Sequence, residues 1–251
     1  MLAIHYVEVY INLIKNLNII ITGTSSGIGL VLTRKFLKNG NKVWGCSRSK
    51  KKIIDKNYFH SKVDLRNKKE IKLWIRKIEK QSNNKVDLFI SNAAQFIRKL
   101  HSLDSLDAIE DAIKINLITP IIISNMVSKI MIKNKSGLIV FFSSVAVELN
   151  QIGSSTYAAS KAGIETFSKV ANNELKNFNI KVATIRILYI PTQLSNKLSK
   201  KEIKNLIKKF KTNLFKNINN LFKKIDEIYH SKSILKKNIF FDVKKIKNNY
   251  E

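Results

Sequence analysis

The chain has 251 residues and a formal net charge of +28, with 46 basic against 18 acidic residues and 44% hydrophobic residues. This length and composition indicate one globular domain and exclude fibrous and disordered proteins, and no apolar run reaches the roughly 18 residues of a membrane span. The single Cys46 excludes an internal disulfide and suits a reducing compartment, so we expect a cytoplasmic protein.

The positive charge is carried almost wholly by lysine, since only six of the 46 basic residues are arginine. Recognition of phosphates and bases usually draws on arginine, so we interpret the charge as a solvated surface and expect no specific nucleic-acid partner. Residues 1–16 are apolar but contain His5 and Glu8 and have neither a basic start nor a small-residue cleavage site. We therefore expect an N-terminal extension and not a signal peptide.

Predicted strands and amphipathic helices alternate along the chain, the order typical of a parallel sheet covered on both faces. The strands are expected at residues 17–22, 42–47, 58–63, 86–91, 138–142 and 180–187. The helices are expected at 27–39, after Asn67, in a pair whose second member spans about 112–132, and at about 156–176. The predicted fold is an α/β, Rossmann-type doubly wound parallel sheet with three α/β/α layers, and residues 1–251 form a single domain.

The character of the sequence changes at about residue 193. Apolar residues recur every three or four positions from Ile203 to Ile228, with lysines between them, which predicts one or two amphipathic helices within a variable region at 193–232. We favour a helix that covers the protein's own active site. Binding of this basic segment to an anionic membrane, a nucleic acid or another partner remains an alternative. Residues 239–243 could add an edge strand.

A glycine-rich turn, Thr-Gly-Thr-Ser-Ser-Gly-Ile-Gly at residues 22–29, joins the first strand to the first helix and contains three of the chain's eight glycines. Such a turn lets a pyrophosphate approach the backbone at a helix N-terminus, which predicts a dinucleotide site. The same residues fit a hydrolase nucleophile elbow with Ser25 as nucleophile. We reject that interpretation because no persuasive acid and histidine follow.

A second motif, Tyr-Ala-Ala-Ser-Lys at residues 157–161, lies in the last of the predicted helices before residue 193. Residues four apart share one helix face, so the Lys161 ammonium can lie near the Tyr157 hydroxyl. A neighbouring cation would lower the pKa of the tyrosine toward the working pH, where the phenol can exchange a proton with a substrate.

Taken together, these motifs resemble the short-chain dehydrogenase/reductase family over residues 18–194. The turn at 22–29 resembles the family's Thr-Gly-x-x-x-Gly-x-Gly, and Tyr157 with Lys161 resembles its Tyr-x-x-x-Lys. Ser144, 13 residues before Tyr157, lies where the family has its catalytic serine. The resemblance implies a catalytic set of Asn116, Ser144, Tyr157 and Lys161. It implies a cofactor-binding set of Gly23, Ser25, Ser26, Gly27, Ile28, Gly29, Arg48, Asp64, Asn92, Ala93, Tyr157, Lys161, Ile190 and Thr192.

The implied activity is hydride transfer between a nicotinamide cofactor and a carbonyl or secondary alcohol, without a metal. Ser144 would hydrogen-bond the carbonyl oxygen, Tyr157 would protonate it, Lys161 would lower the tyrosine pKa and hold the nicotinamide ribose, and Asn116 would hold a relay water. Each residue taken singly also has a purely structural interpretation. The partners implied are a small-molecule substrate and further copies of the chain, as a homodimer or homotetramer.

The cofactor preference follows from the end of the second strand. Arg48 stands there with no acid before Asp55, which favours the 2′-phosphate of NADP(H), with NAD(H) possible. Two departures from the family pattern are Ala94 in place of a glycine and Ile187-Leu188 in place of Pro-Gly. The second departure motivates the alternative of a catalytically silent, dinucleotide-binding regulator.

Overall fold

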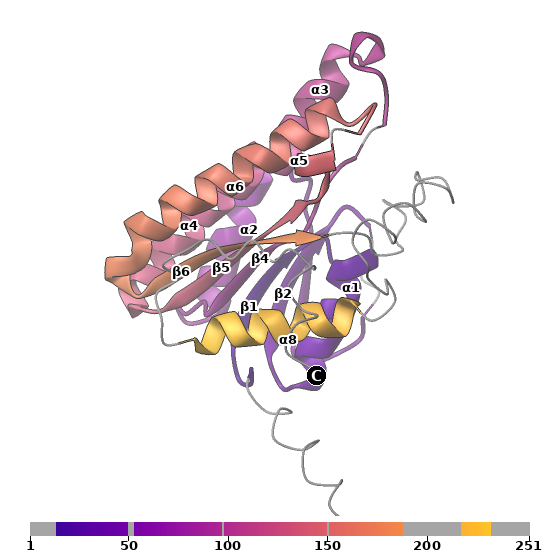
Figure 1. Ribbon diagram of the computed structural model, residues 1–251. Coiled ribbons are helices and arrows are strands. Elements are labelled where there is room, and N and C mark those ends of the chain that lie inside the picture. Colours follow the sequence, from indigo (N-terminus) through magenta and orange to yellow (C-terminus); the bar gives the residue numbers. More distant parts are fainter. Residues whose placement is uncertain (1–13, 50–52, 97, 150, 188–216, 232–251) are drawn as a thin grey trace, which may run out of the picture.

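A six-stranded parallel sheet organises the computed structural model, which describes residues 14–49, 53–96, 98–149, 151–187 and 217–231 (Figure 1). The strands are β1 (Asn18–Thr22), β2 (Lys42–Ser47), β3 (Tyr58–Lys62), β4 (Leu88–Ser91), β5 (Gly137–Ser144) and β6 (Ile180–Ile187). Their spatial order is β3-β2-β1-β4-β5-β6, the doubly wound order in which the direction of winding reverses between β1 and β4. The predicted fold class is confirmed.

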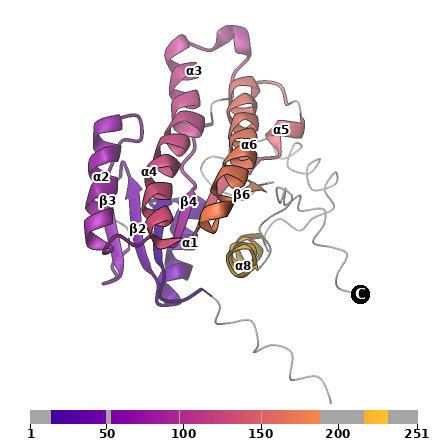
Figure 2. The ribbon, with the colours of Figure 1, turned by 90° about the vertical axis from the view of Figure 1, so that its left-hand side faces the viewer.

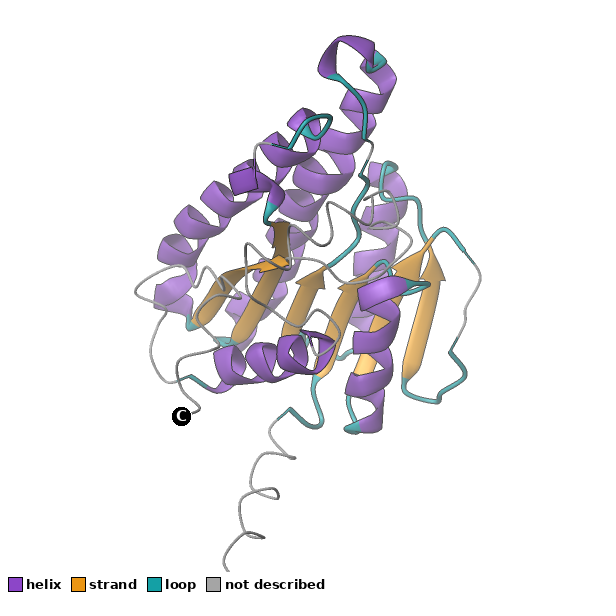
Figure 3. Cartoon of the chain, turned by 45° about the vertical axis from the view of Figure 1, so that its right-hand side comes forward, coloured by secondary structure: helices purple, strands orange, loops and turns teal. Residues whose placement is uncertain are grey.

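Helices cover both faces of the sheet. On one side lie α2 (Lys68–Gln81), α4 (Thr119–Asn134) and α6 (Ser155–Leu175), which Figure 2 shows side by side. On the other side lie α1 (Gly27–Lys38) and α8 (Asn217–His230), seen in front of the strands in Figure 3. The remaining elements are short: η1 (His101–Leu103), α3 (Leu106–Ile113), the π-helical turn η2 (Lys114–Ile118), α5 (Ala146–Leu149) and η3 (Lys176–Phe178).

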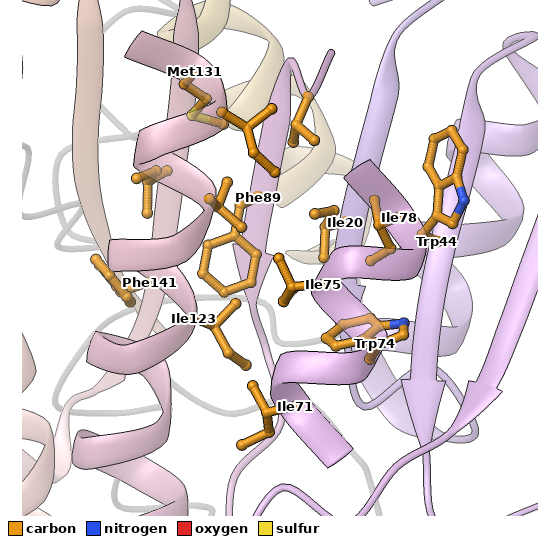
Figure 4. Packing of buried hydrophobic residues seen from close by; sticks show 14 of the residues in the cluster. Ile20, Trp44, Ile71, Trp74, Ile75, Ile78, Phe89, Ile123, Met131 and Phe141 are labelled. Carbon is orange, nitrogen blue, oxygen red and sulfur yellow. The ribbon is translucent and has the colours of Figure 1, made fainter. Parts of the chain in front are cut away.

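Each face of the sheet has its own apolar core because successive side chains along a strand point to opposite sides. Ile19 and Ile21 pack in the cluster that contains Leu32 and Phe36 of α1. Ile20 belongs to the opposite cluster with residues of α2 and α4 (Figure 4). In that cluster the labelled side chains are Ile20, Trp44, Ile71, Trp74, Ile75, Ile78, Phe89, Ile123, Met131 and Phe141.

The long helix after β4 starts earlier than predicted. The sequence suggested a second helix at about 112–132, whereas α3, η2 and α4 run without a break from Leu106 to Asn134. By length and composition alone this helix could cross a membrane, but half of its most apolar window is buried inside the protein. Ile123, Val127 and Ile130 are fully buried against the sheet, so the helix serves as a core element.

The described part of the C-terminal apolar stripe packs on the core of the sheet and not over the predicted active site. Within the described part, Leu221, Ile225 and Ile228 of α8 are buried in the same core as Phe36. Lys181, at the start of β6, donates to the carbonyl oxygens of Ile228, Tyr229 and Ser231 at 3.2, 2.8 and 2.5 Å. The end of α8 therefore lies at the amino-terminal edge of the sheet, away from the glycine turn. The predicted residues 203–216 and 239–243 lie outside the described residues.

Candidate functional site

The glycine turn lies at the carboxyl end of β1, where the winding of the sheet reverses and α/β proteins bind their ligands. Gly23 has φ +74°, and a Cβ atom there would lie 3.0 Å from the Cα atom of Ala93. A Cβ atom on Gly29 would overlap the carbonyl oxygen of Gly23 and the amide of Asn92. Helix α1 can therefore approach β1 and the segment after β4 only because these two positions are glycine.

Asn92 and Ala93 hold the turn in place from the neighbouring strand. The side-chain amide of Asn92 donates to the carbonyl oxygens of Thr22 and Gly23 at 2.8 and 3.1 Å. The backbone N–H groups of Asn92 and Ala93 donate to the Thr22 hydroxyl at 3.1 and 3.0 Å. The structure thus brings both predicted segments together, and it shows Asn92 engaged with the protein backbone.

The N-terminus of α1 is arranged to receive an anion. Ser26 occupies the N-cap position without a side-chain hydrogen bond to the helix, and the first turn contains no acidic residue. Ser25 is half-buried and Ser26 is exposed at the start of this helix. Its first N–H groups and positive dipole end therefore fit the pyrophosphate of a dinucleotide.

The adenosine end of the predicted site contains three groups from β2 and β3. The Ser47 hydroxyl lies 2.9 Å from Nε2 of His60, and the side chain of Arg48 is exposed beside them at the end of β2. The sequence interpretation omitted Ser47 and His60. The alternation of side chains along the strands could have indicated both residues. Side chains two residues apart lie on the same face of the sheet, and so do those of paired residues on neighbouring strands.

Asp64, two residues after the end of β3, forms an ion pair with Arg66. Nη2 of Arg66 lies 2.7 Å from its carboxylate, and Nη1 of Arg66 lies 2.9 Å from Asp111 of α3. The Arg66 guanidinium holds the pKa of Asp64 at about 2. The carboxylate therefore has a structural task that the sequence did not indicate, beside its predicted contact with adenine.

Ser144, Tyr157 and Lys161 meet at the carboxyl end of β5. Ser144 ends β5, and its hydroxyl accepts from the N–H of Ala146 at 3.2 Å and lies close enough to Tyr157 to lower the pKa of the phenol. Nζ of Lys161 lies 5.7 Å from the centre of the Tyr157 ring and donates to the carbonyl oxygen of Phe142 at 2.8 Å. The pair that helical spacing predicted, Tyr157 and Lys161, thus lies together with Ser144, which the resemblance implied.

The charge state of Tyr157 and Lys161 is governed by burial. Burial raises the pKa of Tyr157, and the hydrogen bond from Ser144 offsets part of this increase. Burial lowers the pKa of Lys161 to about 8. We expected Lys161 to lower the tyrosine pKa, but its ammonium is directed to the Phe142 carbonyl and the desolvation of the phenol dominates.

Asn116 lies beside this group in the π-helical turn η2, and its side chain is fully buried. Its Oδ1 accepts from the N–H of Gln95 and its Nδ2 donates to the carbonyl oxygen of Gln95, both at 2.8 Å. The next residue, Phe96, packs its ring 4.8 Å from that of Tyr157 at an angle of 56°. Asn116 therefore fixes the segment that carries Phe96, a site residue that the sequence interpretation missed.

Of the departures from the family pattern, Ala94 and Ile187 can be located, whereas Leu188 lies outside the described residues. Ile187 is the last residue of β6 and pairs with Ser144, so the strand continues through the position where the family pattern has proline. Ala94 is half-buried after β4. Ile190 and Thr192 lie outside the described residues.

A dinucleotide-type glycine turn at the switch point of a doubly wound sheet, beside a serine, tyrosine and lysine, defines the class of NAD(P)-binding oxidoreductases. The chain belongs to the short chain dehydrogenase family, whose sequence model matches residues 17–203.

Relatives and solved structures of the same family resemble the chain over most of its length. A 3-oxoacyl-[acyl-carrier-protein] reductase FabG of Chlamydia pneumoniae is 28% identical over 190 residues, which cover 72% of this chain and 76% of the relative. The corresponding FabG of Buchnera aphidicola is 31% identical over 197 residues, covering 76% and 80%. The crystal structure of a 3-ketoacyl-(acyl-carrier-protein) reductase from Brucella melitensis complexed with NADH superimposes with a TM-score of 0.79 at 16% identity, covering 89% and 94%.

Proposed function

We propose that the protein reduces a carbonyl compound with NADPH, or oxidises the corresponding secondary alcohol with NADP⁺. The observation that carries the proposal is the meeting of Ser144, Tyr157 and Lys161 at the carboxyl end of β5, with Nζ of Lys161 5.7 Å from the centre of the Tyr157 ring. In the reductive direction Ser144 orients the carbonyl oxygen. Tyr157 then donates its phenolic proton to that oxygen while the carbonyl carbon accepts a hydride, so the product is a neutral alcohol.

The bound cofactor would supply the hydride, and the residues along the carboxyl edge of the sheet suit it. The uncapped start of α1 would hold the pyrophosphate, and Asp64 the adenine. Lys161, whose ammonium is buried next to Tyr157, would hold the nicotinamide ribose. Asn116 already holds the Gln95 backbone, and the relay water we predicted for it remains part of this proposal.

The preference for NADPH rests on the exposed Arg48 at the end of β2. Arg48→Ala should weaken NADPH binding by about 1.5–3 kcal/mol, the range for charge-assisted hydrogen bonds, and leave NADH binding nearly unchanged. Arg76→Ala, an exposed arginine on α2, is the matched control. Equal affinity of the wild type for NADH and NADPH in a binding titration would contradict the preference.

The decisive experiment is Tyr157→Phe, because this change removes only the hydroxyl. We expect turnover to be lost and cofactor binding to be retained. Turnover is followed by the absorbance of the reduced cofactor with a panel of ketones and 3-oxoacyl thioesters, the latter included because several relatives are named 3-oxoacyl reductases. Tyr229→Phe on α8 is the control.

Activity of Tyr157→Phe within a few-fold of the wild type would refute the role of Tyr157 as the acid. Cofactor binding without turnover of any substrate by the wild type would favour a silent regulator.

We also propose a cytoplasmic enzyme of one domain that assembles as a homodimer or homotetramer through α4 and α6. The support is apolar surface next to α4 and on α6. Ile118, the last residue of η2 directly before α4, is 45% exposed, and Val170 of α6 is 52% exposed. Light scattering at micromolar concentration should give a multiple of 28.8 kDa, and a monomeric mass would contradict the assembly.

A further inference from the structure

A group of ion-paired side chains lies directly behind the proposed catalytic residues. Arg186 of β6 donates from Nε and Nη2 to the two carboxylate oxygens of Glu165 at 2.6 and 2.7 Å. Nη1 of the same guanidinium donates to Glu148. The side chains of Arg186 and Glu165 are only 13% and 5% exposed, whereas that of Glu148 is 49% exposed. The group therefore reaches from the interior to the surface.

This group joins the elements on which the proposed chemistry depends. In the sheet, Arg186 pairs with Ser143, the neighbour of Ser144. Ser143 donates from its hydroxyl to Glu165 at 2.7 Å, so β5 is tied to α6 through the same carboxylate. Glu165 lies on α6 one turn after Lys161. Glu165 thus connects Arg186 to α6, the helix that carries Tyr157 and Lys161.

The second contact of Arg186, with Glu148, reaches the short helix that follows Ser144. Glu148 belongs to α5, and the N–H of Ala146 at the start of α5 donates to the Ser144 hydroxyl at 3.2 Å. The orientation of the Ser144 hydroxyl therefore depends on where α5 lies. Arg186 holds α5 through Glu148 and α6 through Glu165 with one rigid, planar group.

We propose that Arg186 is a positioning residue that fixes α5 and α6 against the end of β5, and so keeps the Ser144 and Tyr157 side chains next to each other. The proposal rests on the function proposed above. A buried ion pair is often no more stabilising than a well-packed apolar substitute. An apolar substitute could not bind α5 and α6 at the same time, as the forked Arg186 guanidinium does. Misplacement of reacting groups by about 1 Å can cost about 100-fold in rate.

The first test separates positioning from stability. Arg186→Met leaves Glu165 buried without its cation and is expected to destabilise the protein, so the informative variant is the double change Arg186→Met with Glu165→Gln, which keeps an acceptor for the Ser143 hydroxyl. We expect the double variant to unfold at nearly the wild-type temperature and to bind NADPH within about twofold of the wild type. We expect its kcat to remain about 10- to 100-fold lower. Recovery of the wild-type kcat in the double variant would overturn the proposal.

The second test addresses the contact between Arg186 and α5, and one of its two readouts, hydrogen exchange, does not require turnover. Glu148→Gln, at a half-exposed position, should leave the unfolding temperature unchanged. It should speed hydrogen–deuterium exchange of the backbone amides of α5 several-fold and lower kcat several-fold. Glu174→Gln, an exposed glutamate on α6, is the control and should change neither. Unchanged exchange of α5 in both Glu148→Gln and the double variant would overturn the positioning role. Absence of turnover in the wild type would refute the proposed function. It would not refute the positioning of α5, which hydrogen exchange tests separately.

Discussion

Replacing Lys161 by methionine should abolish turnover and at the same time stabilise the cofactor-free protein. Lys161 is 5% exposed, and burial lowers its pKa from 10.5 to about 8. At pH 7 the side chain is therefore protonated in a site that disfavours its charge. The difference between the two pKa values corresponds to an upper limit of about 3 kcal/mol of folding free energy.

Part of this gain is offset in the variant. Methionine cannot donate to the carbonyl oxygen of Phe142, a hydrogen bond that contributes about 1 kcal/mol. The flexible thioether chain can fill the volume of the lysine stem without strain. We therefore expect Lys161→Met to raise the free energy of unfolding by about 1–2 kcal/mol at pH 7.

The stability difference between Lys161→Met and the wild type should depend on pH in a defined direction. Because the pKa is lowered in the folded state, the cost of the charge is fully present below about pH 8 and disappears as the pH rises toward 10.5. The stability advantage of the variant should thus be largest at pH 7 and shrink between pH 8 and 10.5.

Urea unfolding of both proteins at several pH values measures this difference, since other groups that titrate in the same range cancel between them. Lys169→Met, at an exposed position of the same helix, is the control and should change stability by less than about 0.5 kcal/mol. A variant less stable than the wild type at pH 7, or a difference independent of pH, would refute the reasoning.

Three further predictions concern the glycine turn, the end of α8 and the ion pair of Asp64. Gly29→Ala should lower stability by several kcal/mol and abolish cofactor binding, as measured by urea unfolding and titration, because the added methyl overlaps the Asn92 amide. Lys181→Met should lower the free energy of unfolding by about 1–2 kcal/mol and speed hydrogen exchange in α8, whose terminal carbonyls lose their donor. The ion pair of Asp64 with Arg66 should stabilise the protein fully above about pH 4 and lose its effect as the pH falls toward 2, so thermal unfolding of Arg66→Met and the wild type should converge over that range.

The sequence by itself determined the features that depend on neighbours in the chain. Alternation between short apolar strands and amphipathic helices predicted all six strands to within two or three residues, because the periods of strand and helix are properties of the local backbone. The glycine turn and the spacing of Tyr157 and Lys161 could be recognised in the sequence for the same reason, because each concerns residues within about two helical turns of one another.

Only the tertiary structure decided which distant residues meet. The pairing of Asn116 with the Gln95 backbone, and the burial that raises the pKa of Tyr157, depend on the surroundings that folding creates. Arg186 stands 21 residues from Glu165 and 38 from Glu148, and nothing in their separation along the chain marks them as partners. They meet because β6 pairs with β5 while α6 packs across both strands, and that arrangement results from burying two apolar faces of one sheet at once.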